Sequence, residues 1–370
     1  MNILHTESSQ GWGGQEIRIL REAEGLRERG YNIILAVTAG GGLVTKAREK
    51  GFMVYEVPMR KKSALSTLVQ LQRIIKDHEI HIVNTHSSWD SWMGGIAARL
   101  TGRKVLRTRH LSTKIRGGIN SRILYNSLAD FVVTTSSCII SSIIGQSKLS
   151  ADLIRCIPTG VDPSSIKVEE GDIHLFRNML VKPDEILVGT VCFVRSWKGV
   201  QDLMKAAQIV KHKNPKIKWV VVGGGYYKEY IGALDILNIK DVVTFTGNLD
   251  SPYSAMAALD IFLLLSTNHE GISQASLQAS YLKRPLITTS IGGLPEVCLH
   301  ESTGLVVPPF SPEKVAEAVL RLAADPSLRK AMGENAHALV VDRYTLTHTL
   351  DQMEQVYKVL LPETPPRDFL

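Results

Sequence analysis

The sequence predicts an α/β protein made of two doubly wound domains, and three observations support this fold class. The chain has 370 residues, which is more than one hydrophobic core usually supports. Its composition, 44% hydrophobic and 21% charged, is globular and excludes a disordered chain, a fibre or a disulfide-stapled miniprotein. In both halves, short apolar runs alternate with amphipathic segments of helix length, as in parallel sheets covered by helices.

The first half repeats one supersecondary unit. Met1–His5 is an apolar run, the turn Gly11–Gly14 follows, and the apolar stripe after it predicts a helix that ends at Gly30. A strand, a glycine turn, a helix and a second strand form the unit that builds parallel sheets. Further strands are predicted at residues 33–37, 54–57, 82–84, 105–107 and 131–134, with helices around residues 68–75, 96–100 and 122–128.

The periodicity breaks at Ile157–Pro163, where a domain boundary is predicted, and then restarts. Strands are predicted at residues 187–192, 218–222, 242–245, 261–265, 286–289 and 305–307, and helices at about 200–211 and within 312–361. We expect an N-terminal domain of residues 1–162 and a C-terminal domain of residues 163–345, facing each other across a cleft. Residues 346–370 are expected to hold a helix that packs back on the N-terminal domain.

Charge and cysteine content bear on the partners and the compartment. Lys and Arg outnumber Asp and Glu by 43 to 36, which favours anionic partners such as phosphates, nucleic acid or an acidic membrane face. No apolar run reaches the ~20 residues that span a bilayer, and the N-terminus lacks the regions of a signal peptide, so a cytoplasmic protein is expected. The cysteines lack metal-finger spacing and are expected to be small buried hydrophobes: Cys138, Cys156, Cys192 and Cys298.

Two loops that follow strands hold candidate phosphate-binding groups. Arg195 and Lys198 stand between the first strand and the first helix of the second half, where open α/β sheets bind ligands. A guanidinium fork and a mobile ammonium suit a diphosphate. Gly13 and Gly14 precede a helix whose first N–H groups can meet an anion or sugar hydroxyls, although a tight turn without a ligand explains them equally well.

The richest polar segment is residues 266–279, which follows the predicted strand at 261–265 and includes His269. Glu270 lies in the predicted turn and Gln278 in the helix after it. A carboxylate accepts hydrogen bonds from hydroxyls, and an amide both donates and accepts, as the vicinal diols of sugars and riboses require. The segment therefore favours a sugar or nucleotide ligand.

These motifs, in this order, resemble the family 4 retaining glycosyltransferases of the GT-B fold over essentially the whole chain. The family signature of two Glu separated by seven residues stands here as Glu270 and Gln278. A Gly-Gly-x-Pro-Glu loop follows as Gly292–Glu296, and the segments Thr303–Pro309 and Thr159–Asp162 also fit. GT-B proteins consist of two Rossmann-like domains, in agreement with the domain prediction.

The resemblance implies a role for each candidate residue. His110, which ends a strand of the first domain, is expected to act beside the donor sugar together with Glu270 and Lys198. His86 and Arg109 are expected to line the acceptor side. The resemblance and the loops above place the donor on Gly13, Gly14, Arg195, Lys198, Ile272, Ser273, Gln274 and Gln278.

Two positions depart from the family pattern. Gln278 replaces the second Glu, so the ribose contact loses its charge assistance. The Gly-Arg pair that the family carries before its lysine is Cys192–Phe193 here. Arg195 is the nearest cation to that place.

The implied activity is transfer of a sugar from a nucleotide diphosphate sugar to a glycan or lipid-linked acceptor, with retention of configuration. No cofactor and no metal are expected, because the chain has no Asp-x-Asp and no Cys/His cluster with ligand spacing. The segments 107–112 and 196–199 resemble those of bacterial envelope enzymes, which suggests lipopolysaccharide or polysaccharide synthesis and a peripheral site on the cytoplasmic face of the inner membrane.

Two other classes of function remain open at this stage. A non-catalytic polyanion binder would use the basic residues of the first half, although the lack of interleaved aromatic residues argues against nucleic acid. These residues are Arg60, Lys61, Lys62, Arg107, Arg109, Lys114 and Arg116. A sugar-nucleotide epimerase or a phosphorylase of the GT-B fold is the second alternative.

Overall fold

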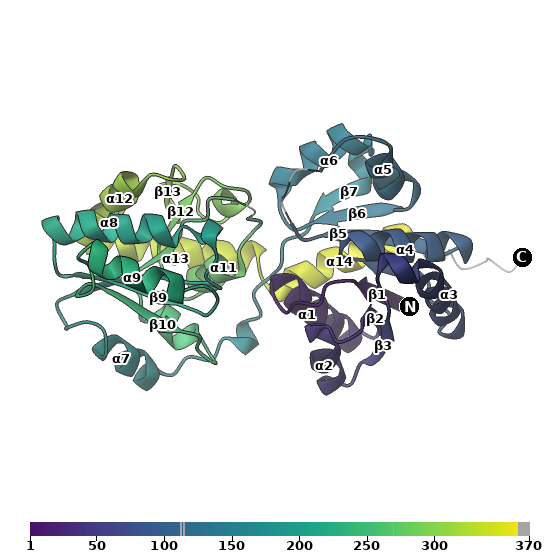
Figure 1. The fold of residues 1–370 in the computed structure, drawn as a ribbon, viewed down its shortest axis with the longest axis horizontal. Coiled ribbons are helices and arrows are strands. Elements are labelled where there is room, and N and C mark those ends of the chain that lie inside the picture. The colour runs from purple at the N-terminus through teal and green to yellow at the C-terminus, as the bar shows by residue number, and fades with distance from the viewer. Residues whose placement is uncertain (112, 114, 269, 362–370) are drawn as a thin grey trace, which may run out of the picture. The chain divides into compact units, whose positions relative to one another are not determined.

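The computed structural model describes residues 1–111, 113, 115–268 and 270–361. The described chain divides into two compact units, one made of residues 1–159 with the residues from 346 onwards, the other of residues 160–345. Each unit is a parallel sheet with helices on both faces (Figure 1), which confirms the predicted fold class. The chain passes between the units twice, at Thr159–Gly160 and at Thr345–Leu346.

The described residues of the N-terminal unit form a seven-stranded parallel sheet in the order β3-β2-β1-β4-β5-β6-β7. Its strands are β1 (Asn2–Glu7), β2 (Asn32–Thr38), β3 (Met53–Val57), β4 (Ile82–Thr85), β5 (Lys104–Arg109), β6 (Phe131–Thr134) and β7 (Ile154–Cys156). The sequence does not predict β7, because three residues are too few to show an apolar alternation.

Helices cover both faces of this sheet, because successive side chains of a strand point to opposite sides. Ile3 and Leu35 pack in one apolar cluster with α1, α2 and α14. Leu4 and Ile34, one residue away in each strand, pack in another cluster with α3 and α4. The helices of this unit are α1 (Gly14–Glu28), α2 (Gly42–Glu49), α3 (Ala64–Asp77), α4 (Ser88–Leu100), α5 (Ile119–Arg122), α6 (Ile140–Ser147) and α14 (Leu346–Leu360).

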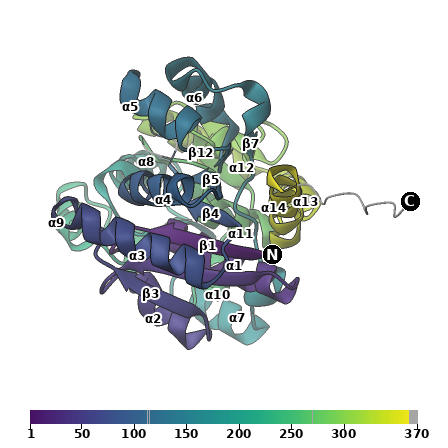
Figure 2. The same cartoon turned by 90° about the vertical axis from the view of Figure 1, so that its right-hand side faces the viewer.

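The last described helix, α14, belongs to the N-terminal unit although it comes from the other end of the chain. Figures 1 and 2 draw it in yellow among the purple and blue elements of this unit. Met353 and Tyr357 are fully buried in the cluster that also contains α1. A Cβ on Gly25 of α1 would lie 2.4 Å from Leu350 Cδ1, so glycine permits the close approach of these two helices.

The helix predicted around residues 122–128 has a different form in the structure. The short helix α5 continues into a π-helical turn, Ile123–Ser127, in which the N–H of Leu128 donates to the carbonyl of Ile123 at 2.8 Å. The turn buries Tyr125, whose ring lies 4.5 Å from the Arg107 guanidinium. The apolar spacing of the sequence does not predict this winding.

The described residues of the C-terminal unit form a six-stranded parallel sheet in the order β10-β9-β8-β11-β12-β13. Its strands are β8 (Ile186–Val191), β9 (Ile217–Val222), β10 (Val243–Gly247), β11 (Ile261–Leu264), β12 (Leu286–Thr289) and β13 (Gly304–Val307). Its helices are α7 (Glu170–Asn178), α8 (Val200–Lys213), α9 (Lys228–Ile236), α10 (Tyr253–Ala257), α11 (Gln274–Tyr281), α12 (Pro312–Ala324) and α13 (Pro326–Arg343). All six strands overlap the predicted ones.

Candidate functional site

The carboxyl ends of β8 and β11 bring two candidate residues of the C-terminal unit together. Lys198 follows β8 and Glu270 follows β11, and the Lys198 ammonium forms an ion pair with Glu270 Oε1. Ser266 Oγ donates to the same carboxylate oxygen at 3.3 Å. The pair is largely shielded from solvent, with 18% and 9% of the two side chains exposed. A cation and a carboxylate are thus held at the edge of the sheet where ligands of open α/β folds bind.

Two glycines permit the backbone geometry of this pair. Gly199, at φ 70°, leads from the Lys198 turn into α8, and a Cβ there would lie 2.0 Å from the Leu265 carbonyl oxygen. Gly292, at φ 58°, lies in the loop after β12, and a Cβ there would lie 1.7 Å from the Glu270 carbonyl oxygen. The N–H of Gly293 donates to that carbonyl at 3.3 Å. The Gly-Gly-x-Pro-Glu loop therefore supports the backbone of Glu270.

The other donor-side candidates of this unit lie around the start of α11. Ser273 is the N-cap and Gln274 the first residue of the helix, while the side chain of Ile272 is buried. The first N–H groups of a helix lack carbonyl partners within it and attract anions. Gln278 is half-buried in the second turn. Its role at a ribose stays a prediction.

Arg195 lies in the same loop as Lys198 but in a different environment. Its side chain is exposed, and its guanidinium lies 5.1 Å from the ring of Phe193 and 5.1 Å from the ring of Trp197. Phe193, one of the two residues that replace the Gly-Arg pair of the family, thus takes part in a cation–π cluster with Arg195 and Trp197. A contact between Arg195 and a diphosphate stays a prediction.

In the N-terminal unit, the glycine turn is joined to the ends of two strands. Gly13 is the N-cap of α1, and its N–H donates to Glu16 Oε2 at 2.9 Å. Gly14 begins the helix and is exposed. The next residue, Gln15, donates from its amide to Ser87 Oγ at 2.8 Å and to the carboxylate of Glu7, which ends β1. The turn is therefore held beside the carboxyl ends of β1 and β4.

Glu7 and Asp90 form a buried carboxylate pair that the sequence analysis missed. Burial, and next the charge of Asp90, raise the pKa of Glu7 to about 7. Burial also raises the pKa of Asp90, whose Oδ2 accepts from the N–H of His86 at 2.8 Å and from Thr6 Oγ1 at 3.1 Å. Asp90 belongs to the capping box of α4, a local signal visible in the sequence; the proximity of Glu7 depends on the order of the strands.

Three histidines form a chain of hydrogen bonds across this sheet. His5 Nδ1 lies 2.9 Å from His86 Nε2, and His86 Nδ1 lies 2.9 Å from His110 Nε2. The sequence singles out His86 and His110, whereas it hides His5 within an apolar run. Burial lowers the pKa of His5 to about 3, and burial is also the first cause that holds the pKa values of His86 and His110 well below their usual range.

A buried cation stands near these rings. Arg18 of α1 is 1% exposed and donates to the carbonyl of Ile157 at 2.7 Å and to Thr159 Oγ1 at 3.1 Å. Its charge further lowers the pKa values of His86 and His110. The imidazoles are therefore neutral at physiological pH.

The acceptor-side candidates differ in their accessibility. Arg109 donates to Tyr125 Oη at 3.1 Å and to the carbonyl of Thr113 at 2.5 Å, so its guanidinium holds the loop after β5. Both ring nitrogens of His86 take part in the histidine chain. Arg107, which the polyanion-binding alternative requires, is 5% exposed. An acceptor role for His86 and Arg109 stays a prediction.

The cysteines only partly match the expectation of small buried hydrophobes. Cys298 is buried, and burial raises its pKa and that of half-buried Cys192 to about 11. Cys156 is half-buried as well, but Cys138 is exposed, because it lies in the turn after β6 rather than in a strand. The spacing of the cysteines in the sequence does not show that Cys138 lies in such a turn and is therefore exposed.

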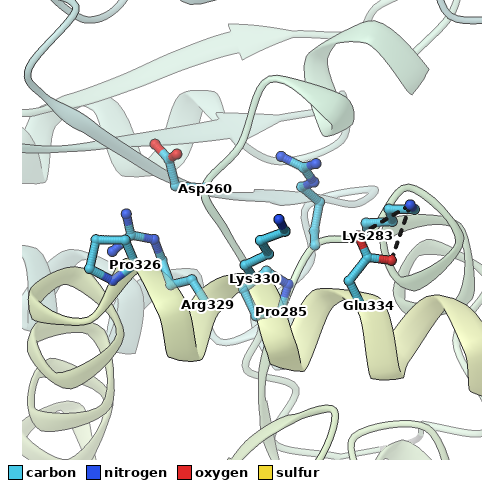
Figure 3. A pocket seen from close by; sticks show the side chains of 8 residues that line it. Asp260, Lys283, Pro285, Pro326, Arg329, Lys330 and Glu334 are labelled. Atoms are coloured by element: carbon cyan, nitrogen blue, oxygen red, sulfur yellow. Dashed lines mark hydrogen bonds and ion pairs between the residues drawn. The ribbon is translucent and has the colours of Figure 1, made fainter.

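A separate cavity of about 240 Å³ lies at the opposite edge of the C-terminal sheet, beside the amino ends of β11 and β12 (Figure 3). Several of its charged groups form ion pairs or hydrogen bonds with other groups of the protein. Asp260 binds Arg177 at 2.9 Å, and Lys283 binds Glu334 at 3.0 Å. Arg329 donates to the carbonyl of Leu322 at 2.6 Å. The residues that line it are Asp260, Lys283, Arg284, Pro285, Pro326, Arg329, Lys330 and Glu334.

The described residues contain neither a metal-binding cluster nor a membrane-spanning helix. No group of three or more His, Cys, Asp or Glu in that part of the chain is arranged to hold a metal ion. None of its helices is both long and apolar enough to cross a membrane. Ser112, Lys114 and His269, which belong to segments singled out in the sequence, lie outside the described residues.

The comparisons with known proteins agree with this geometry. Residues 12–165 match the model of Glycosyltransferase Family 4, and residues 174–339 match that of Glycosyl transferases group 1. The capsular polysaccharide biosynthesis glycosyltransferase CapM of Staphylococcus aureus is 23% identical over 363 residues, which cover 93% of this chain and 94% of that protein.

Solved structures show the same fold along the whole chain. A glycosyltransferase from Rickettsia africae has a TM-score of 0.89 at 22% identity, covering 98% of this chain and 99% of that one. Anabaena HepE, solved with UDP, has a TM-score of 0.87 at 21% identity, covering 97% and 100%. The chain therefore belongs to the group 1 glycosyltransferases of family 4, has the GT-B fold and is a glycosyltransferase.

Proposed function

We propose that this enzyme transfers a sugar from a nucleoside diphosphate sugar, bound by the C-terminal unit, to a glycan or lipid-linked acceptor of cell-envelope polysaccharide synthesis. The observation that carries the proposal is the ion pair between Lys198 and Glu270 at the carboxyl edge of the C-terminal sheet. It supplies both groups that such a donor needs, a cation for the diphosphate and a carboxylate for the sugar hydroxyls.

The ion pair keeps both groups oriented before the donor binds. When the glycosidic bond to the diphosphate breaks, negative charge grows on the leaving oxygen, and an ammonium already in place stabilises it. The N–H groups at the start of α11 add a partial positive charge. Glu270, held by Ser266 and by the loop that contains Gly293, accepts hydrogen bonds from the donor sugar. Transfer with retention of configuration follows from the family resemblance.

The related proteins support the class of donor and acceptor. HepE is described with UDP and with UDP-glucose. A 27% identical mycobacterial relative, which shares 78% of its length with this chain, is a GDP-mannose-dependent phosphatidylinositol monomannoside mannosyltransferase. The CapM relative acts in capsular polysaccharide biosynthesis. HepE and the mycobacterial relative are thus described with nucleoside diphosphate sugars that differ in base and sugar, and the mycobacterial relative and CapM with a mannolipid and a capsular polysaccharide.

The proposal includes two further features. The reaction runs without a metal ion, because Lys198 and the start of α11 offer the positive charge that the leaving diphosphate needs.

The N-terminal unit docks on an anionic membrane through the start of α3. There, exposed Arg60, Lys61 and Lys62 precede Leu65 and Val69, which are 77% and 57% exposed. Leu65 and Val69 are four apart and share a face of α3, and the three cations directly precede this helix.

The test combines binding with turnover. Purified enzyme is screened by thermal shift against UDP, GDP, ADP and their sugars, since a ligand at about 100 times its dissociation constant adds about 2.7 kcal/mol of stability. With the donor so found, Lys198→Ala is expected to lower kcat by about 10²–10³-fold. Lys240→Ala is the matched control, because this lysine also pairs with a carboxylate, Asp235, but on the surface.

Two results would contradict the proposal. One is that no nucleoside diphosphate or its sugar shifts the unfolding temperature. The other is that folded Lys198→Ala turns over every candidate donor as fast as Lys240→Ala does. Circular dichroism of both variants separates a loss of turnover from a loss of fold.

A further inference from the structure

The three histidines of the hydrogen-bonded chain come from three neighbouring strands of the N-terminal sheet. His5 lies in β1, His86 directly after β4 and His110 directly after β5, and the ring centroids of successive pairs are 5.1 and 5.2 Å apart. The strand register pairs His5 with Asn84 and Asn84 with Leu106. Each step of the chain therefore moves one strand across and two residues along, which keeps all three rings on one face of the sheet.

A count of protons constrains the hydrogen bonds. A neutral imidazole carries one N–H, so one ring nitrogen donates and the other accepts. His86 uses both nitrogens, Nε2 towards His5 and Nδ1 towards His110. It therefore donates to one neighbour and accepts from the other, and the two hydrogen bonds must point the same way along the chain.

The two ends of the chain are not equivalent. Nε2 of His5 is buried and has no hydrogen-bond partner within the described residues. His110 is half-buried. Unlike Nε2 of His5, its remaining nitrogen, Nδ1, is not both buried and without a hydrogen-bond partner in the described part of the protein. If His110 donated to His86 and His86 donated to His5, Nδ1 of His5 would accept. The proton of His5 would then lie on its buried Nε2, as an N–H without an acceptor. The opposite direction leaves only a lone pair there, and orphaned buried N–H groups are the rarer and costlier case.

We propose that the chain runs outward, so that His5 Nδ1–H donates to His86, His86 Nδ1–H donates to His110, and His110 presents its Nδ1–H to substrate. His5 and His86 are then positioning residues that fix the tautomer and the ring orientation of His110. His110 is a one-way hydrogen-bond donor to a substrate oxygen. This inference rests on the proposed glycosyl transfer for the identity of that oxygen, but the direction of the chain does not.

The charged and titratable groups around the chain keep it neutral. Arg18 faces His86 and His110 from α1, and each ring faces the next one from the neighbouring strand. The charge of Arg18 opposes a second proton on His86 and His110, and burial opposes one on all three rings. His110 therefore stays a neutral ring with a single N–H near neutral pH.

The test reads the tautomers directly in the full-length protein. Nitrogen-15 spectra of histidine-labelled enzyme distinguish a protonated ring nitrogen from an unprotonated one, and single-histidine variants assign the 11 histidines. All three rings are expected to show a protonated Nδ1 and a bare Nε2, unchanged between pH 8 and pH 6. A protonated Nε2 on His110, or rings that titrate near their ordinary pKa, would overturn the proposal without any measurement of activity.

A matched pair of variants tests the positioning role of His86. In His86→Asn the amide nitrogen hangs from Cγ as Nδ1 does, so it still donates to His110. In His86→Phe the ring remains but the donor is lost. We expect Asn to keep kcat near wild type, and Phe to lower kcat by about 10-fold or more with little change in KM. A rise in acceptor KM for both variants, with kcat unchanged, would make His86 an acceptor ligand instead.

Failure of the two ideas can be told apart. If no donor supports transfer but the spectra show the outward tautomers, the proposed function fails and the chain direction stands. If transfer occurs and His110 carries its proton on Nε2, the chain direction fails and the proposed function stands.

Discussion

At the scale of single residues, the departure from the family pattern at Gln278 gives a selective prediction. If its amide binds the ribose hydroxyls, Gln278→Ala leaves a diol unpaired and weakens nucleotide binding by about 1–3 kcal/mol. A 2′-deoxy nucleotide should bind the wild-type enzyme more weakly by a similar amount, but lose little more in the variant. Calorimetric titration of both proteins with ribo- and deoxyribonucleoside diphosphates completes a double-mutant cycle between Gln278 and the 2′-hydroxyl. Additive effects would show that Gln278 lies outside the ribose site.

Glu7 gives a prediction about stability and pH. Burial raises its folded pKa from an ordinary 4.5 to about 7. Between about pH 4.5 and pH 7, the Glu7 carboxyl is therefore protonated in the folded state and ionised in the unfolded state. The contribution of Glu7 to the free energy of unfolding falls as pH rises from about 4.5 to 7 and is constant above. Glu7→Gln removes this penalty, so the variant should gain up to about 3 kcal/mol relative to wild type between pH 5 and pH 8.

The effect of Glu7 is measured as the difference in unfolding free energy between wild type and Glu7→Gln. This comparison is needed because the buried histidines change the stability with pH in the opposite direction. Their lowered folded pKa values make the wild-type protein lose stability as pH falls below their ordinary 6.5. Urea unfolding of wild type and Glu7→Gln at each pH cancels this shared contribution. A difference in unfolding free energy that does not change with pH would place the ionisation of Glu7 in its ordinary range.

At the scale of elements, the start of α3 is the part of the N-terminal unit that we expect to meet a membrane. Each cation near an anionic bilayer contributes about 1 kcal/mol, so loss of three cations alone weakens vesicle binding by about 10²-fold, and reversal of their charge should weaken it by at least that much. The variant reverses Arg60, Lys61 and Lys62 to Glu, and sedimentation with anionic and neutral vesicles measures the effect. Turnover of a soluble acceptor should remain.

The matched control for α3 reverses three exposed lysines of the C-terminal unit, Lys228, Lys240 and Lys314. It changes the net charge of the protein by the same amount. Equal losses of vesicle binding in both variants would mean that overall charge, rather than the start of α3, attracts the membrane. No loss in either would leave the basic run as an ordinary solvated surface.

At the scale of the whole molecule, the absence of a metal requirement stays a prediction. We expect transfer to continue in EDTA, because Lys198 and the start of α11 supply the positive charge that a divalent cation would provide. The control is a metal-dependent transferase inhibited under the same conditions. Loss of turnover with chelator, restored by Mg²⁺ or Mn²⁺, would contradict the prediction.

The sequence by itself determined the features that depend on local pattern. Apolar runs separated by amphipathic segments gave twelve strand positions, since a buried parallel strand is apolar on both faces. Lys198 and Glu270 could be chosen because each lies in the loop after such a run, and parallel strands end at the same edge of a sheet. Their ion pair follows from that rule and from the neighbouring strands β8 and β11.

The tertiary structure alone decided which distant residues meet. His5 and His86 are 81 residues apart, and His86 and His110 are 24 apart, so their hydrogen bonds exist only because β1, β4 and β5 are neighbours in register. The same strand order places Glu7 beside Asp90 and buries Arg107 against Tyr125, although the polyanion-binding alternative required this arginine to meet a ligand. Periodicity shows which face of an element is buried, but the identity of the partner on that face is set by packing between elements.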